Sequence, residues 1–314
     1  MKVKIANKVG FCYGVNRAYD KTNKLLQNNN AKTYLFGELV HNKLVVNSLK
    51  KQGIKIFEDI NKLPIDSKDS RVIIRAHGIT LEERRILENN FREIIDLTCP
   101  IVNRMTSFVR EKQKEGFFVV VFGKESHPEM RGLKGSVDQN KIKITKDIKK
   151  ETFKKVCIAS QTTVDNKSFK DFYLKYLKIN DFSDIIIKNT ICIETSKREI
   201  EAEEISQWAD AVIVLGGKNS SNTKKLVNIS KNNNKNTFHI EEIKELDKLN
   251  LNFEKIGILT GASTAMWTLK ELTEYLENNY SVEIIDWSQY FLIYKEVSLN
   301  ERKDFWRITS RRRN

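Results

Sequence analysis

The feature that most constrains the fold of this chain is a cysteine that recurs three times in one local setting. Cys12, Cys99 and Cys192 each stand at a turn that precedes a helical pattern. In each case a small polar residue follows four positions later and a basic residue five positions later. The intervals are 87 residues from Cys12 to Cys99 and 93 residues from Cys99 to Cys192. The spacing indicates three repeats, and each would present one thiol at a helix start, where the thiolate form is favoured.

The elements between the cysteines also recur in the same order. The next apolar strand ends at a glycine, Gly37, Gly123 or Gly216, which follows its cysteine by 25, 24 and 24 residues respectively. Strands alternating with helices predict parallel sheets covered on both faces. We therefore expect an α/β fold, a pseudo-threefold trefoil of three similar α/β domains with mainly parallel sheets around a common centre. The expected units are 1–98, 99–190 and 191–286, followed by a C-terminal tail, 287–314, to which no function is assigned.

The expected elements can be stated by residue range. Strands are predicted over 33–36, 54–57, 71–74, 93–96, 117–122, 141–144, 156–159, 184–187, 211–215, 238–240, 255–259 and 283–286. Helices are predicted over 42–51, 81–90, 103–115, 164–177 and 267–277. The strand over 283–286 corresponds in this scheme to the strand over 93–96, but no cysteine follows it because the ring of repeats has closed.

Polar side chains gather in the loops after these strands. The residue four positions beyond each strand-ending glycine is His41, His127 or Ser220. A second set of loops carries His77, Thr162 and Ser263. Ligands bind at the carboxyl ends of parallel strands, so these loops and the three thiols should converge on one cavity. Imidazoles, hydroxyls and helix N-termini suit an anion; helix capping alone explains one such loop but not six at equivalent places. His239 lies within a short strand and is interpreted as structural.

The cysteines indicate how a metal could be bound and in which cellular compartment the protein is expected. Three thiolates can hold zinc with a histidine as fourth ligand, or a four-iron cluster with one iron left open, and spacing alone does not choose between them. Cys157 lies in the middle of a predicted strand and is interpreted as a core residue. Four cysteines without a secretion signal favour a reducing cytoplasm. No apolar run approaches the ~20 residues of a membrane helix, so no membrane association is expected.

The net charge of +14 has three explanations. A nucleic-acid partner is one, a surface rich in Lys and Asn is the second, and steering of an anionic small substrate is the third. The charge is scattered along the chain, which favours the last two, so no nucleic-acid partner is expected. Two rival functions stay open on residues alone: a zinc-stabilised nucleic-acid-binding protein, and a zinc hydrolase acting on a phosphorylated compound.

At this point the motifs resemble a known family. They are Gly-Phe-Cys12-Tyr-Gly-Val, Val-His41-Asn, Ala-His77-Gly, Asp-Leu-Thr-Cys99-Pro, Gly-Lys-Glu-Ser-His127-Pro-Glu129, Ser-Gln161-Thr162-Thr, Asn-Thr-Ile-Cys192, Asn-Ser220-Ser221-Asn222 and Gly-Ala-Ser263-Thr. Over residues 9 to about 270, and in this order, they resemble the 4-hydroxy-3-methylbut-2-enyl diphosphate reductases, the LytB family. This family catalyses the last step of the methylerythritol phosphate route to isoprenoids.

The resemblance implies a central [4Fe–4S] cluster held by Cys12, Cys99 and Cys192. It implies an oxidoreductase that removes the hydroxyl of the diphosphate substrate to give isopentenyl and dimethylallyl diphosphates, with electrons from ferredoxin or flavodoxin. The implied substrate-binding residues are His41, His77, His127, Thr162, Ser220, Ser221, Asn222 and Ser263. The implied catalytic residues are Glu129, His127 and Thr162, with Glu129 delivering the proton. Two positions depart from the family pattern: Ala265 replaces a frequent Pro, and Glu199 replaces the usual Gln.

Overall fold

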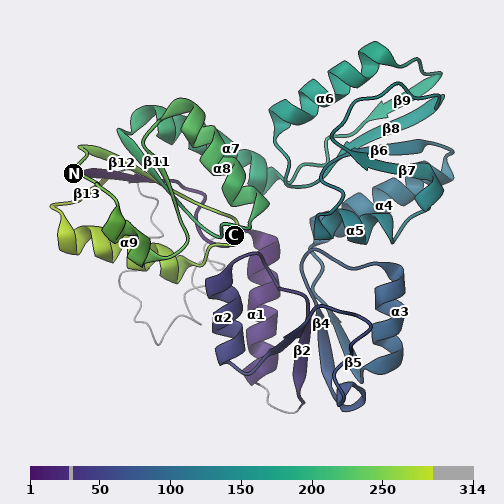
Figure 1. Cartoon of the computed structure of the whole chain (residues 1–314), viewed down its shortest axis with the longest axis horizontal. Coiled ribbons are helices and arrows are strands. Elements are labelled where there is room, and N and C mark those ends of the chain that lie inside the picture. The colour runs from purple at the N-terminus through teal and green to yellow at the C-terminus, as the bar shows by residue number, and fades with distance from the viewer. Residues whose placement is uncertain (28–30, 286–314) are drawn as a thin grey trace, which may run out of the picture.

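The computed structural model describes residues 1–27 and 31–285, which form three lobes around a common centre (Figure 1). The tail predicted over 287–314, and Asp286 at the end of the last predicted strand, lie outside the described residues. Every strand pairing in the three sheets is parallel, and helices flank each sheet. The predicted α/β trefoil is thereby confirmed. No helix in the described part of the chain is long and apolar enough to cross a bilayer.

The first lobe has the strand order β3-β2-β4-β5. Its strands are β2 (Thr33–Phe36), β3 (Lys55–Phe57), β4 (Arg71–Ile74) and β5 (Glu93–Asp96). Its helices are α1 (Tyr13–Gln27), α2 (Lys43–Lys51) and α3 (Leu81–Asn90). A short 3-10 turn, η1 (Ser67–Asp69), precedes β4. The ends of β2, β4, α3 and β5 agree with the ranges predicted from sequence.

The second lobe repeats this order as β7-β6-β8-β9. Its strands are β6 (Phe118–Phe122), β7 (Ile142–Thr145), β8 (Lys155–Ser160) and β9 (Asp184–Ile187). Its helices are α4 (Pro100–Lys114), α5 (Pro128–Lys134) and α6 (Asn166–Ile179), with a 3-10 turn η2 (Gln139–Lys141). α4 begins three residues earlier than predicted, because Pro100 is compatible with the first helical position.

The third lobe has five strands in the order β11-β10-β12-β1-β13. These are β1 (Lys2–Ile5), β10 (Ala211–Leu215), β11 (Thr237–Ile240), β12 (Lys255–Thr260) and β13 (Glu283–Ile285). The helices are α7 (Ile193–Trp208), α8 (Ser221–Asn233) and α9 (Met266–Asn279), with a 3-10 turn η3 (Ile243–Lys248).

The place of β1 corrects one expectation. β1 pairs with β12 on one side and with β13 on the other. It therefore occupies the position that β5 and β9 hold in their sheets, and like them it leads to a cysteine. The strand predicted over 283–286 does not take that position, since β13 is added outside β1. The division into units at 98 and 190 stays a prediction; by its hydrogen bonds, the first strand of the chain belongs to the third sheet.

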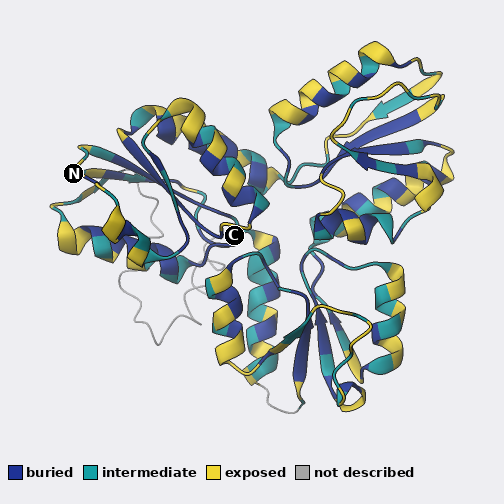
Figure 2. Cartoon of the chain, in the orientation of Figure 1, coloured by how far each residue is buried: buried dark blue, intermediate teal, exposed yellow. Residues whose placement is uncertain are grey.

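The core of each lobe is its sheet. The central strands are runs of β-branched and aliphatic residues, and all five residues of β10 are buried. Figure 2 shows the buried strands enclosed by helices whose outer faces are exposed. A parallel strand that is buried on both faces has a nearly continuous apolar sequence. For this reason these strands could be recognised in the sequence.

Candidate functional site

The three cysteines occupy equivalent positions where the lobes meet. Cys99 and Cys192 are the N-cap residues of α4 and α7, and Cys12 directly precedes α1. Each cysteine N–H donates to a carbonyl in a neighbouring strand-end loop: Cys12 to Ala262 at 2.9 Å, Cys99 to Ala76 at 2.9 Å and Cys192 to Thr162 at 2.9 Å. None of the three is disulfide-bonded. One backbone hydrogen bond, repeated three times, thus fixes each thiol against a loop that carries a predicted site residue.

The three thiols are close enough to influence one another. Burial raises the pKa of Cys12, and the nearby Cys99 and Cys192 raise it further. Cys192 also has its pKa raised by burial, while the N–H groups of Glu194 and Thr195 act in the opposite direction. A Cβ added to Gly14 would stand 2.5 Å from the Cys99 sulfur. α1 of the first repeat therefore approaches the Cys99 thiol as closely as only a glycine permits.

These residues fit an iron–sulfur cluster. Three thiolates held together repel one another, and cationic iron would supply the missing positive charge. Within residues 1–27 and 31–285, no three His, Cys, Asp or Glu side chains lie close enough together to hold a single metal ion. A four-iron cluster has a different requirement, because each of the three cysteines would bind a different iron atom.

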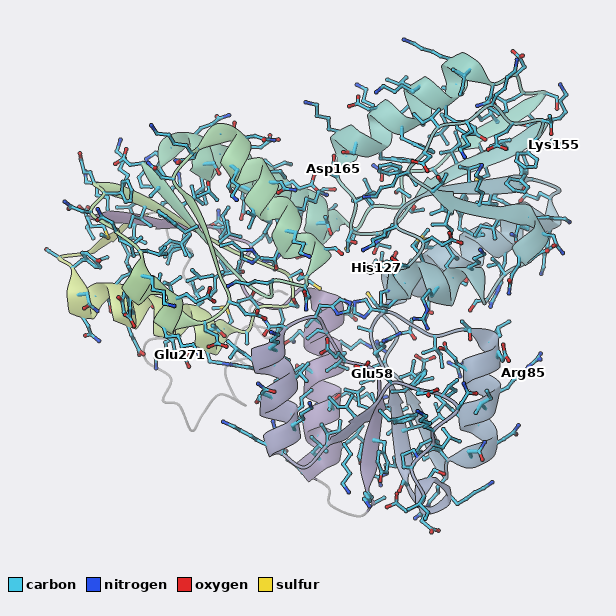
Figure 3. The ribbon with its side chains drawn as sticks, viewed as in Figure 1. Glu58, Arg85, His127, Lys155, Asp165 and Glu271 are labelled. Atoms are coloured by element: carbon cyan, nitrogen blue, oxygen red, sulfur yellow. The ribbon has the colours of Figure 1, made fainter. Side chains whose placement is uncertain are left out.

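Three of the four histidines form one cluster at the centre. The ring centroids of His41 and His77 lie 4.6 Å apart in a stacked arrangement, and His127 lies 6.0 Å from His41 and 5.7 Å from His77. Figure 3 places His127 where the lobes converge. His239 is not part of this group; its Nε2 lies 3.0 Å from the Gly216 carbonyl oxygen, a local contact that fits a structural role.

The electrostatics of the cluster keep two of these imidazoles neutral. Burial, followed by the neighbouring His41 and His127, holds the pKa of His77 well below its ordinary value. Burial first, and then His41 and Lys124, lowers the pKa of His127 to about 4. The Nδ1 atom of His127 accepts from the Glu129 N–H at 3.2 Å, so its proton resides on Nε2. The Nδ1 atom of His77 is buried without a hydrogen-bond partner. His77 therefore has a buried ring nitrogen that is available to a hydrogen-bond partner from outside the protein.

Glu129 and Thr162 form a buried pair beside this cluster. Glu129 is 2% exposed; its Oε1 accepts from the Thr162 N–H at 2.9 Å and its Oε2 lies 2.7 Å from Thr162 Oγ1. Burial raises the pKa of the Glu129 carboxyl, although the two Thr162 hydrogen bonds lower it in part. A carboxyl group in this setting keeps a proton more readily than a solvated one. The carbonyl of Thr162 also accepts a hydrogen bond from the Cys192 N–H. Glu129 therefore lies next to the three cysteines.

The third lobe contributes hydroxyl and amide groups. Ser220 caps α8 by accepting from the Thr223 N–H, and Ser221 is the first residue of that helix. Asn222 accepts the Ala262 N–H at 2.9 Å through Oδ1, while its Nδ2 and the Ser263 Oγ are buried without partners. The preceding Gly217 lies against the first lobe, because a Cβ there would collide with the His41 carbonyl oxygen. These donors and the histidines thus come from loops in mutual contact.

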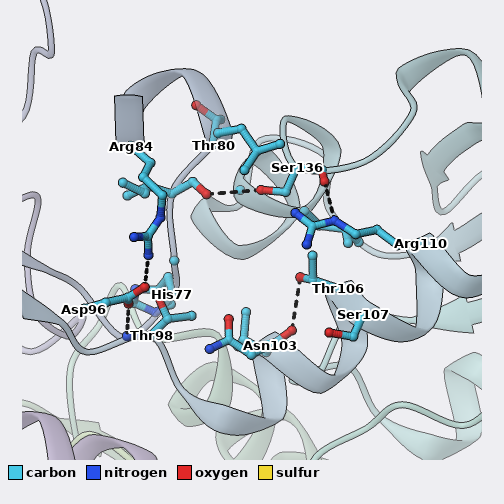
Figure 4. Close-up of a pocket in the computed structure, with 16 residues that line it drawn as sticks. His77, Thr80, Arg84, Asp96, Thr98, Asn103, Thr106, Ser107, Arg110 and Ser136 are labelled. Atoms are coloured by element: carbon cyan, nitrogen blue, oxygen red, sulfur yellow. Dashed lines mark hydrogen bonds and ion pairs between the residues drawn. The ribbon is translucent and has the colours of Figure 1, made fainter. Parts of the chain in front are cut away.

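A cavity of about 290 Å³ lies beside the histidine cluster, between α3, α4 and α5 (Figure 4). His77 is part of its wall, so the cavity adjoins the predicted site. Arg84 lines it and is paired with Asp96, whereas Arg110 donates from Nε to the Ser136 carbonyl at 2.8 Å. The predicted site residues other than His77 do not line this cavity.

Sequence reasoning missed one buried residue, Arg198 of α7, which is 2% exposed and hydrogen-bonds the loop before Cys12. Glu199 itself is buried and forms an ion pair with Lys225. The negative charge that Glu introduces in place of the family Gln is therefore paired with a cation. Ala265 is the N-cap of α9 and makes no side-chain cap. An Arg in the middle of an otherwise charged helix gave no signal that its side chain is buried.

The fold and the site define a three-lobed α/β protein whose centre combines three thiols, three histidines and a buried acid. The family model described as LytB protein matches residues 3–277. The chain belongs to the LytB family, which confirms the resemblance predicted from its motifs.

Curated relatives agree over most of the chain. A protein of Petrotoga mobilis named 4-hydroxy-3-methylbut-2-enyl diphosphate reductase is 46% identical over 277 residues, covering 88% of this chain and 97% of that protein. A protein of Pseudothermotoga lettingae with the same name is 42% identical over 278 residues, covering 88% of this chain and 98% of that protein.

Solved structures show the same architecture. One, described as (E)-4-hydroxy-3-methyl-but-2-enyl diphosphate reductase, the terminal enzyme of the non-mevalonate pathway, matches with a TM-score of 0.65 and 32% identity over 88% of this chain and 99% of that one. The reductase from Plasmodium falciparum matches with a TM-score of 0.81 and 26% identity over 100% of this chain and 99% of that one.

Proposed function

We propose that this chain is a 4-hydroxy-3-methylbut-2-enyl diphosphate reductase that forms isopentenyl and dimethylallyl diphosphates. The observation that carries the proposal is the convergence of three equivalent thiols with a histidine cluster and a buried acid. The overall change adds two electrons and two protons. The carbon–oxygen bond of the substrate hydroxyl breaks, one proton leaves with that oxygen as water, and the other is added to carbon.

In this proposal Cys12, Cys99 and Cys192 hold a [4Fe–4S] cluster. When bound, a cluster of this kind supplies electrons and Lewis acidity at an iron that has no thiolate ligand. The electrons come from an external carrier, a ferredoxin or flavodoxin, and the protein resides in the reducing cytoplasm, where free thiols persist.

The histidines bind the diphosphate as neutral hydrogen-bond donors. Burial lowers the pKa of His127 to about 4 and holds the pKa of His77 well below its ordinary value, which leaves each ring with one N–H at neutral pH. The unpartnered Asn222 Nδ2 and Ser263 Oγ add donors from the third lobe, and Ser220 and Ser221 place the N-terminus of α8 beside them. An anion supplied by the substrate would give His77 Nδ1, Asn222 Nδ2 and Ser263 Oγ the hydrogen-bond partner that each lacks.

Glu129 holds the proton that the leaving hydroxyl needs. Its raised pKa favours the protonated form, and its contact with Thr162 Oγ1 provides a path for that proton toward the site. Thr162 therefore orients the acid and contacts the reacting end of the substrate.

The test is anaerobic purification followed by assay with the substrate and a chemical reductant. Brown protein that contains iron and sulfide and converts the substrate to both products is expected. Serine at Cys12, Cys99 or Cys192 should abolish cluster and turnover, while Cys157→Ser should keep both. Colourless zinc-containing protein that only releases phosphate from the substrate would refute the proposal and favour a zinc hydrolase.

A further inference from the structure

Arg198 is a buried cation whose hydrogen bonds all go to uncharged oxygen atoms. Its Nη1 donates to the Lys8 carbonyl at 2.7 Å and to the Thr260 carbonyl at 2.8 Å, with Thr260 Oγ1 at 3.2 Å. Its Nη2 donates to the Gly10 carbonyl at 2.8 Å. Within residues 1–27 and 31–285 no carboxylate forms an ion pair with this guanidinium, although the charges of Glu194 and Glu201 favour its charged form. Burial of a charged guanidinium costs free energy that hydrogen bonds or an opposite charge must offset.

The hydrogen bonds of Arg198 fix the segment that presents Cys12. Lys8 and Gly10 belong to the loop between β1 and Cys12, and Thr260 ends β12. The loop after β12 provides the Ala262 carbonyl that accepts the Cys12 N–H. The Gly10 N–H also donates to Thr260 Oγ1 at 3.0 Å. The guanidinium of Arg198 thus links both chain segments that hold Cys12. Its rigid, planar arrangement of N–H donors suits it to several acceptors at once.

The charge of Arg198 lies beside the segment that holds the first thiol. Its Nη2 donates to the carbonyl of Gly10, two residues before Cys12, and its Nη1 donates to the carbonyl of Thr260, two residues before the Ala262 that accepts the Cys12 N–H. Interactions between buried charges are weakly screened. An electron added to a cluster held by the three cysteines makes that cluster more negative. A fixed cation beside it therefore stabilises the reduced state more than the oxidised state.

We propose that Arg198 is a positioning residue that fixes Cys12 and raises the reduction potential of the cluster. The charge role rests on the proposed function, because it requires the cluster; the positioning role concerns the protein alone.

Three variants separate the two roles. Arg198→Met keeps much of the volume but removes the charge and the donors. Arg198→Lys keeps the charge but cannot reach all four acceptors. The matched control is Lys197→Gln, which removes one positive charge from the adjacent, exposed position of α7.

The measurement is an anaerobic redox titration of the cluster-loaded protein, followed by electron paramagnetic resonance. For Arg198→Met we expect the equilibrium constant for one-electron reduction to fall tenfold or more, which corresponds to 59 mV. Lys197→Gln should change it less than twofold, and Arg198→Lys should stay closer to wild type than Arg198→Met. Equal potentials for Arg198→Met and Lys197→Gln, or a potential for Arg198→Lys as low as that of Arg198→Met, would overturn the charge role.

Hydrogen exchange on the metal-free protein tests positioning separately. The amides of Gly10 and Cys12 should exchange faster in Arg198→Met and Arg198→Lys than in wild type or Lys197→Gln, while amides of the first and second sheets stay unchanged. Unchanged protection at both amides would overturn the positioning role. Wild-type protein that binds no cluster would refute the proposed function and the charge role together, whereas the exchange result would still decide the positioning role.

Discussion

Glu129→Gln replaces a buried carboxyl group with an amide of nearly the same shape. The amide oxygen can still accept the Thr162 N–H now received by Oε1, and the amide nitrogen can donate to Thr162 Oγ1. Both contacts therefore survive in altered form, and we expect the free energy of unfolding at neutral pH to change by about 1 kcal/mol or less. The variant should fold and hold its cluster, but it lacks an acidic proton.

The expected loss of turnover is about 10²–10⁴-fold, the usual contribution of a positioned general acid. The assay is anaerobic steady-state turnover with a chemical reductant, together with substrate binding measured by calorimetry on the oxidised protein. Binding should stay within a few-fold of wild type. Glu125→Gln is the matched control, because Glu125 precedes the same helix but is exposed and paired with Lys134 at 2.6 Å.

The same variant has a pH signature. Burial raises the pKa of Glu129 above its ordinary value of 4.5, so folded wild-type protein binds this proton more tightly than the unfolded chain. Its contribution to stability is present at low pH and is lost as the pH rises from 4.5 through the raised pKa. Glu129→Gln should therefore gain stability relative to wild type over that rise, measured by urea unfolding. Near-normal turnover of cluster-loaded variant, or a stability difference independent of pH, would refute the reasoning.

Three further changes test other parts of the centre. His127→Gln should reduce the loss of stability between pH 6.5 and about pH 4 in urea unfolding, because wild-type His127 has a pKa of about 4 and resists a proton that the unfolded chain binds; identical pH profiles would contradict this. Gly217→Ala should cost about 1–3 kcal/mol and weaken inorganic diphosphate binding, because its Cβ collides with the His41 carbonyl oxygen; an unchanged Tm would count against the contact. Cys157→Ser should cost about 1–3 kcal/mol, because it buries a hydroxyl in β8, but should keep the iron content of wild type; loss of iron would show that this cysteine is a ligand.

The repeats were predictable because each lobe solves the same packing problem with the same order of elements. Buried parallel strands require continuous apolar runs, which β6 and β10 display, and polar residues must follow where these strands end. The clustering of His41, His77 and His127 could therefore be expected from topology alone. The structure confirms that these three rings lie together.

The features that could not be predicted from the sequence depend on contacts between segments that are far apart in the chain. Lys2–Ile5 is a short strand with alternating Lys residues, and nothing in it indicates that its partner begins at Lys255. The burial of Arg198 depends on carbonyl groups of a loop 190 positions away, as in its bond to Lys8. The hydrogen bonds between Glu129 and Thr162 also join distant segments, the start of α5 and the loop after β8, although both residues were singled out by their motifs.

The position of β1 between β12 and β13 affects the order in which the parts of the third sheet can assemble during synthesis in the cell. The strand that leads to Cys12 leaves the ribosome first, but its neighbour Lys255–Thr260 is made about 250 residues later. At about 5–20 residues per second, the delay is on the order of 10–50 seconds. Cys12 is thus synthesised first but cannot be fixed in place until β12 and the loop after it have been made. Under the proposed function, cluster loading must also wait for that part of the chain.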